Sequence, residues 1–124
     1  MINATDTSGE AWTGDQVLAA LGALANPHRL RIVAALAGGR TYVSRLAREL
    51  GIGRPLLHMH LAKLEAAGLV RSQLELGDEG KAMRFFEVVP FALALTPERI
   101  ARAAQSLSTD AAVDRPARIA EEGT

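Results

Sequence analysis

Apolar residues recur every three or four positions through the first half of the chain, which predicts a series of amphipathic helices. Capping signals mark the helix boundaries. Thr13 and Gln16 have the spacing of a capping box, so the first helix is expected to begin directly after Thr13. Asn26-Pro27 combines an N-cap with a proline in the first turn, and Gly38-Gly39 ends this second helix.

Two further helices are predicted in the middle of the chain. The first of them ends at Leu50, because Gly51 stands where a left-handed residue is expected after a helix. The other covers about residues 54–67, with Pro55 in its first turn and Gly68 just past its end. Residues 41–44 are compatible with either a short strand or the start of a helix.

The pattern then changes to the alternation of β-strands. Residues 69–76 and 82–89 flank a polar, glycine-containing turn at residues 77–80, which predicts a β-hairpin. Phe91, Leu93 and Leu95 alternate with alanines and extend this pattern. Thr96-Pro97 is expected to start a last helix. The fold class is therefore mainly α with a β-hairpin. We expect one domain over residues 13–107, a flexible N-terminus over 1–12 with Trp12 able to dock, and a disordered tail over 108–124.

Ala47, Gly51 and Leu57 have the relative spacing of a helix-turn-helix. A small residue in the first helix lets the second helix cross it closely, and the turn needs a residue that tolerates positive φ. The second helix must then place an aliphatic side chain between the two. This spacing occurs by chance in many helical proteins. Followed by Gly68-Leu69-Val70 and a hairpin, it becomes a specific indication of a winged helix-turn-helix.

Composition and charge refine this hypothesis. Aromatic residues make up only 4% of the chain, which suits packed helices, and there is no cysteine. No signal peptide or membrane span is predicted, so we expect a soluble, cytoplasmic protein. The net charge is zero, yet residues 27–65 contain seven basic side chains and two acidic ones. This basic middle has the charge expected of a DNA-binding surface, although a solvated helical surface has the same composition.

Several segments resemble the ArsR family of winged-helix transcriptional regulators, in order and over about residues 15–108. Residues 25–32 (ANPHRLRI) are similar to the start of the family's second helix. Residues 46–52 (LARELGI), 54–61 (RPLLHMHL) and 63–70 (KLEAAGLV) resemble its helix-turn-helix, and residues 80–88 (GKAMRFFEV) resemble its wing. The chain departs from the family at Gly53 and His58, where Ser or Thr is frequent, so no operator can be inferred by analogy.

This resemblance implies a dimeric, sequence-specific transcriptional regulator, expected to be a repressor, whose helix 54–67 enters the major groove of double-stranded DNA. Arg54 can pair with guanine, and His58 can contact a base or a phosphate. The remaining expected DNA contacts are phosphate anchors on the helices and on the wing: Arg45, Arg48, Lys63, Lys81 and Arg84. Arg45, Arg48 and Lys63 could instead be part of a solvated helix surface. Arg84 could instead form an ion pair with an acidic residue such as Glu75. Met59 is interpreted as a packing residue.

Metal sensing is not expected, and no cofactor is predicted. The chain lacks cysteine, the last helix lacks histidine, and His58 and His60 diverge by about 200° on one helix. His60 is expected to pack at the edge of the helix-turn-helix or to touch a phosphate. Dimerisation is expected through apolar residues of the first and last helices, and the alternative is that these residues cover the helical core. These are Val17, Leu18, Leu21, Ile100, Ala103, Ala104 and Leu107.

Two other classes of function are the alternatives to a DNA-binding regulator. A winged-helix adaptor would bind a protein partner through the hairpin or the helix 54–67, and exposed Leu56 and Met59 would favour it. An enzyme finds no support, because no paired carboxylates, nucleophile and base, or phosphate-binding loop can be recognised.

Overall fold

The computed structural model describes residues 12–77 and 79–108. The chain divides into two compact units, one of which is Ala20–Pro90, while the other combines the residues up to Ala19 with those from Phe91 onward. The boundary falls inside the first helix, α1 (Gly14–Leu24). The expectations for residues 1–11 and for the tail beyond Ser108 lie outside the described residues.

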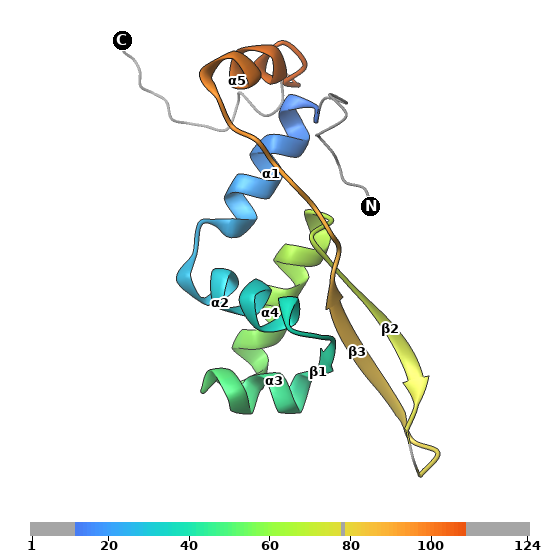
Figure 1. Ribbon diagram of the computed structural model, residues 1–124. Helices are drawn as coiled ribbons and strands as arrows, with labels where there is room; N and C mark the ends of the chain where they lie inside the picture. The colour runs from blue at the N-terminus through green and yellow to red at the C-terminus, as the bar shows by residue number, and fades with distance from the viewer. Residues whose placement is uncertain (1–11, 78, 109–124) are drawn as a thin grey trace. The chain divides into compact units, whose positions relative to one another are not determined.

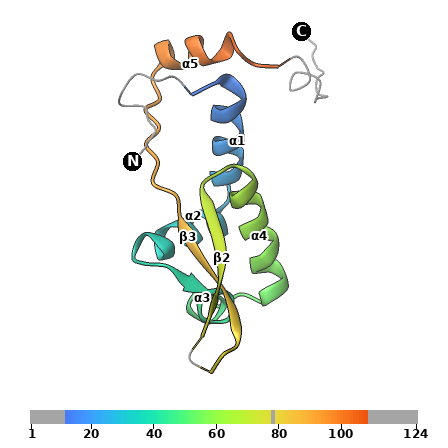
Figure 2. The same ribbon diagram turned by 90° about the vertical axis from the view of Figure 1, so that its right-hand side faces the viewer.

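The larger unit contains the predicted helices and hairpin. Its elements in chain order are α2 (Pro27–Ala37), β1 (Thr41–Tyr42), α3 (Val43–Leu50), α4 (Arg54–Ala66), β2 (Val70–Leu76) and β3 (Ala82–Val88). The strands form one antiparallel sheet in the order β1-β3-β2. In both views the far end of the β2–β3 hairpin projects past the helices of this unit (Figures 1 and 2). We call this hairpin the wing.

The core of the larger unit is built mainly from leucines on the inner faces of its helices. The wing joins this core at its base, where Val70 and Phe86 are both buried. The largest side chains of the core are almost completely buried. They are Ile32, Leu36, Leu46, Leu57, Leu61, Leu64 and Leu69. Burying this apolar area is the main stabilising contribution to such a unit.

The helix boundaries confirm the capping signals. The capping box is reciprocal: the Gln16 backbone N–H donates to Thr13 Oγ1 at 3.0 Å, and the Thr13 N–H donates to Gln16 Oε1 at 2.9 Å. Asn26 Oδ1 accepts from the backbone N–H of His28 and Arg29. Local sequence therefore stabilises these helix starts before any tertiary contact forms.

Residues 41–44 satisfy both interpretations that the sequence left open, because β1 occupies Thr41–Tyr42 and α3 begins at Val43. Residues 89–96, in contrast, belong to no helix or strand. Trp12 is half-buried, as the expected docking requires, and its Nε1 has no hydrogen-bond partner among the described residues.

The smaller unit joins the start of α1 to α5 (Pro97–Ala104) and the residues that follow it. Ser106 Oγ accepts a hydrogen bond from the Gly14 N–H at 2.8 Å and donates one to the Ala103 carbonyl oxygen at 3.0 Å. Asp15 Oδ1 accepts from the Ser108 N–H at 3.0 Å. The Gly14 N–H, which has no partner within α1, is thus hydrogen-bonded to a side chain that follows α5.

Gly14 is required for this close approach. A Cβ at this position would lie 2.2 Å from the Ala103 carbonyl oxygen and 2.8 Å from Leu107 Cγ. Gly14→Ala is therefore expected to separate the end of α5 from α1, because the carbonyl belongs to the backbone and cannot rotate away. Hydrogen exchange of the α5 amides should become at least tenfold faster.

Gly22→Ala is the matched control, because it adds the same methyl to the same helix where a Cβ meets nothing within 4 Å. This control should leave the exchange of α5 unchanged and stabilise α1 by about 0.5–1 kcal/mol, the usual gain of alanine over glycine inside a helix. Equal exchange of α5 in both variants would contradict the proposed packing.

Candidate nucleic-acid interface

The turn between α3 and α4 has the geometry that the sequence predicted. Ala47 is buried where the helices cross, and Gly51 adopts a left-handed conformation with φ 69° and ψ 31°. The backbone N–H groups of Gly51 and Ile52 both donate to the Ala47 carbonyl oxygen, at 2.8 and 3.2 Å. Leu57 is completely buried between the helices. This arrangement holds α4 by one face and leaves the opposite face to solvent.

The solvent face of α4 carries the residues expected to reach DNA bases. Arg54 and His58 are both exposed, and no hydrogen bond or ion pair of the described residues engages them. Leu56 and Met59 are also exposed, by 39% and 45%, so the interpretation of Met59 as a packing residue is wrong. Gly53 precedes α4 without a side-chain cap, as its lack of a side chain dictates.

The expected phosphate anchors on the helices are also exposed. Arg48 and Lys63 are available at the surface of α3 and α4. Arg45 lies 3.5 Å from Glu49, one turn along α3, and both side chains are at least half exposed. An exposed pair of this kind contributes little to stability, so Arg45 can exchange Glu49 for another anion at little cost.

The wing carries fewer free cations than its sequence suggested. Lys81 is exposed, while Arg84 donates to Ser72 Oγ at 3.1 Å. The alternative pairing of Arg84 with Glu75 is wrong, because Glu75 is engaged by another residue. Over residues 70–88 three basic side chains stand against four acidic ones, which leaves the wing with a formal charge of −1. The charges are Arg71, Lys81 and Arg84 against Glu75, Asp78, Glu79 and Glu87.

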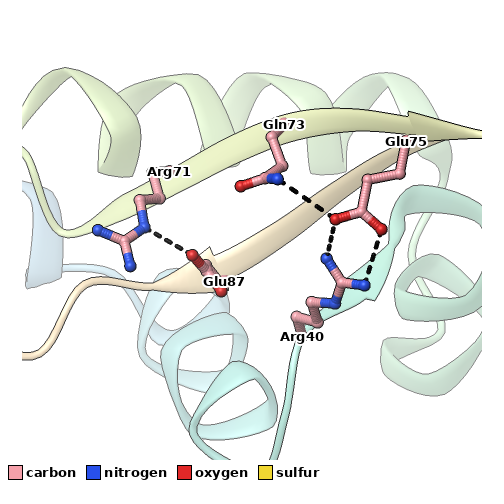
Figure 3. Close-up of polar contacts among 5 residues, drawn as sticks. All are labelled: Arg40, Arg71, Gln73, Glu75 and Glu87. Atoms are coloured by element: carbon pink, nitrogen blue, oxygen red, sulfur yellow. Dashed lines mark hydrogen bonds and ion pairs between the residues drawn. The ribbon is translucent and has the colours of Figure 1, made fainter.

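Arg40 is the residue that engages Glu75 (Figure 3). Its guanidinium donates two hydrogen bonds to the carboxylate, at 2.5 and 2.8 Å, and lies 4.5 Å from the centre of the Phe85 ring. These hydrogen bonds hold the pKa of Glu75 below its ordinary value. The contact ties the residue before β1 to the far end of β2, so it orients the wing on the helical body. A second pair, Arg71 with Glu87 at 2.6 Å, joins the two strands of the wing.

His60 packs inside the protein on the inner side of α4, as one of the two sequence-based alternatives predicted, and it is not free to touch a phosphate. Only 3% of it is exposed, and its Nδ1 accepts a hydrogen bond at 3.0 Å from Arg29, whose Nε also donates to the Ala23 carbonyl oxygen at 2.7 Å. Because Arg29 can only donate, Nδ1 is the acceptor and the ring proton sits on Nε2. Burial, together with Arg29, His28 and Lys63, lowers the pKa of His60.

Arg29 and Arg40 are therefore engaged by other residues of the protein, although both counted toward the basic middle of the sequence. Their roles had no local signal, because Arg29 bonds a residue 31 positions away and Glu75 lies 35 positions from Arg40. Five of the seven basic residues of this stretch therefore remain free or exchangeable at the surface. Arg31 lies on α2, and the other four lie on α3 and α4: Arg45, Arg48, Arg54 and Lys63.

The residues expected to form a dimer interface differ in exposure. Leu18, Leu21, Ile100, Ala104 and Leu107 are exposed, and Val17 is half-buried. Ala103 is already buried within its own chain, because the end of α5 packs on the start of α1 through Gly14. Ala103 is consequently less available to a second copy than the spacing of apolar residues suggested.

Within residues 12–77 and 79–108, no group of three or more His, Asp or Glu side chains is arranged to hold a metal ion. His58 points to solvent and His60 to the interior, as their separation of about 200° requires. No helix in the described part of the chain is long and apolar enough to span a membrane.

A first helix buried on one face, a left-handed glycine turn, a second helix with one face in solvent, and a hairpin define the class of winged helix-turn-helix proteins. Comparison with known proteins identifies the family within this class. The family described as "Bacterial regulatory protein, arsR family" matches residues 26–72. The transcriptional regulator CmtR of Mycobacterium bovis is 35% identical over 105 residues, which cover 78% of this chain and 89% of CmtR.

Solved structures show the same relationship. The homodimeric winged helix-turn-helix DNA-binding domain Mb0332 of Mycobacterium bovis is 27% identical, with a TM-score of 0.56 and a match covering 82% of each chain. The transcriptional repressor BigR of Xylella fastidiosa is 27% identical, with a TM-score of 0.53 over 73% of this chain and 78% of BigR. The chain belongs to the ArsR family of DNA-binding winged helix-turn-helix transcriptional regulators, which are not enzymes.

Proposed function

We propose that this protein is a dimeric repressor that places α4 in the major groove of its operator and the wing on the adjoining backbone or minor groove, blocking transcription by occlusion. The observation that carries the proposal is the exposed set of cations on α3 and α4, next to a helix whose other face is completely buried. Such a helix is held rigidly enough to present side chains to base edges.

The contacts divide into two kinds. Arg54, in the first turn of α4, has a free guanidinium that can donate two parallel hydrogen bonds to guanine O6 and N7, and His58 lies one turn further on. Arg45, Arg48 and Lys63 are phosphate contacts, which set the position of the protein without reading sequence. On the wing, Lys81 is the main contact, because Arg84 already shares Ser72 and the wing as a whole is slightly acidic.

Dimerisation is proposed because an operator with two half-sites needs two recognition helices about one DNA turn apart. The exposed apolar residues Leu18 and Leu21 of α1 and Ile100 of α5 support it, together with Leu107, which lies beyond the end of α5 and not on the last helix as the sequence predicted. The homodimeric state of Mb0332 and the repressor activity of BigR, both similar in fold, support the assembly and the direction of control. The protein would act in the cytoplasm.

We further propose that its signal is not a metal ion. The chain has no cysteine, and two of the nitrogen donors that remain point to opposite sides of α4, at His58 and His60. Thiolate and imidazole ligands converging on one point are what zinc and similar ions require. A titration with zinc, cadmium and nickel should leave the affinity for the operator unchanged within twofold, and release from DNA by any of these ions would contradict this part of the proposal.

A salt titration of DNA binding tests the proposed function. The affinity of the wild-type protein for its best genomic fragment should fall steeply with salt, since each neutralised phosphate contributes about 0.9 to the slope of log K against log salt. Arg54→Ala should weaken binding to that fragment by about 1–3 kcal/mol per site and reduce its advantage over random DNA. Lys63→Ala should weaken all sequences alike and lower the salt slope by about 0.9 per subunit.

Arg31→Ala is the matched control, because it removes the same charge from an exposed position of α2 outside the proposed interface. It should leave the preference between fragments unchanged. If no fragment binds better than random duplex at low salt, the proposal fails.

The second candidate is a winged-helix adaptor that binds a protein through α4. The exposure of Leu56 and Met59 favours it, because large apolar side chains at a surface often mark protein contacts. The cations around them favour DNA, and the same titration separates the two functions, since an adaptor would show no sequence preference.

A further inference from the structure

The centre of the solvent face of α4 is apolar. Successive residues of an α-helix are rotated by about 100°, so the buried residues Leu57, His60, Leu61 and Leu64 define the direction of the core. The residues that point most directly away from the core, within about 30° of the opposite direction, are Pro55, Met59, Ala62 and Ala66. All four are exposed. We call this set the apolar row of α4.

Polar residues flank the apolar row on both sides. His58 and Lys63 lie about 70° to either side of its centre, and Arg54 lies further round on the side of His58. Glu65 is the one acidic residue of α4, and its carboxylate accepts a hydrogen bond from Ser72 Oγ at 3.1 Å. The row is therefore bordered by cationic or hydrogen-bonding groups, while the acid of the helix is occupied at the wing.

This arrangement fits a DNA groove better than a protein surface. Polyanionic strands border the major groove on both sides, so Lys63 meets a phosphate, His58 meets a phosphate or a polar base edge, and Met59 meets the base edges at the centre. Arg45 and Arg48 extend the positive surface onto α3. A protein partner would need acidic rims on both sides of an apolar strip to match the same pattern.

The only apolar group that base pairs present in the major groove is the 5-methyl group of thymine. We propose that Met59, assisted by Leu56 at the side of the row, reads thymine methyl groups in the centre of each half-site. This proposal deepens the proposed function and depends on the placement of α4 in the major groove. Met59 is the one member of the apolar row with a long, flexible side chain, which can follow a methyl group on either strand.

Met59 selects against other base pairs as well as for thymine. A methionine over a G·C pair covers the donor and acceptors of the pair without pairing them, and an unsatisfied polar group at a buried surface carries a penalty. Specificity at these positions thus comes from attraction to a methyl group and from exclusion of polar edges. Arg54, at the start of α4, would add guanine recognition next to the thymines.

Replacing thymine by deoxyuridine tests this inference, because it removes the methyl group and leaves every hydrogen-bonding group in place. The probe is a duplex enriched from a random-sequence pool by binding to the full chain, together with copies that carry deoxyuridine at single thymine positions. For the wild type, loss of the contacted methyl should weaken binding about fourfold per half-site, the change expected for one buried methyl group.

Met59→Ala should bind the thymine duplex more weakly than the wild type does. The variant should bind the thymine and deoxyuridine duplexes with the same affinity, because it lacks the side chain that contacts the methyl group. Leu56→Ala should show a smaller effect of the same kind. Leu30→Ala is the matched control, because Leu30 is 54% exposed on α2, outside the interface, and its removal should leave the fourfold effect of the methyl intact.

The outcomes separate this inference from the proposed function. If the wild type prefers one sequence but is insensitive to deoxyuridine at every thymine, methyl reading is overturned and the regulator stands. Methyl reading by Met59 is also overturned if Met59→Ala keeps the wild-type sensitivity. If no duplex can be enriched over random DNA, the proposed function itself fails.

Discussion

Leu57→Ala is expected to lower the free energy of unfolding by about 2–5 kcal/mol, the range measured for leucine truncations in closely packed cores. Leu57 is completely buried, as are Leu46 on α3 and Leu61 and Leu64 on α4. The rigid crossing at Ala47 and the turn at Gly51 prevent the two helices from closing the cavity. Urea denaturation followed by circular dichroism measures the change.

Leu56→Ala is the control for this prediction, because it removes the same atoms from the adjacent residue, which is 39% exposed. The loss of stability there should stay below about 1 kcal/mol, since the side chain gives up less buried surface and leaves no closed cavity. Similar losses at both positions would mean that α4 is not held by the face that includes Leu57. The same Leu57→Ala variant should also lose DNA affinity, because α4 is no longer held in one orientation.

Acidification is expected to destabilise the protein through His60. Burial is the main cause of its lowered pKa, and the positive charge of Arg29 at 3.0 Å adds to it, with His28 and Lys63 also contributing. The folded protein therefore binds a proton at His60 less readily than the unfolded chain, whose histidine titrates near 6.5. The stability contributed by neutral His60 is complete above about pH 6.5 and decreases as the pH falls toward the lowered pKa of the folded state.

The slope of stability against pH reaches at most about 1.4 kcal/mol per pH unit for one group, so unfolding between pH 7.5 and 5 should reveal it. His60→Gln removes the titrating group and keeps an acceptor for Arg29, and it should reduce this slope. His58→Gln, the same substitution on the exposed side of α4, should leave the slope unchanged. An identical pH profile for the wild type and His60→Gln would show that His60 is not the group responsible.

These two residues, Leu57 and His60, also show how far sequence reasoning reaches. The position of Leu57 was predicted from its spacing to Ala47 and Gly51, because the crossing of two short, adjacent helices depends on local steric rules. His60 had two possible environments in the sequence. Burial against Arg29 decided between them, and Arg29 lies 31 residues away on another helix. A contact between residues so far apart in the chain leaves no periodic pattern in a single sequence.

In the wing, the strands were predicted from the sequence and the charge pairs were not. Its two strands and its turn were predicted from alternation and from Gly77 and Gly80. The charge partners of the wing were not predicted. The alternative that the sequence offered, a pair of Glu75 with Arg84, joined two residues of the same hairpin. The observed pair joins Glu75 to Arg40, which the sheet order β1-β3-β2 brings within reach. Arg40 was thereby removed from the expected DNA-binding charge, and Lys81 was left as the main contact that we propose for the slightly acidic wing.

The sequence by itself determined the helices, their ends, the hairpin and the helix-turn-helix, and with them the family. Each of these depends on interactions within a few residues, such as the reciprocal bonds of Thr13 and Gln16 or the left-handed turn at Gly51. Only the tertiary structure decided which cations remain free and how exposed Met59 is. Those properties depend on which distant residues are packed against each side chain, so the exposure of Met59 at the centre of the recognition helix emerged from the fold.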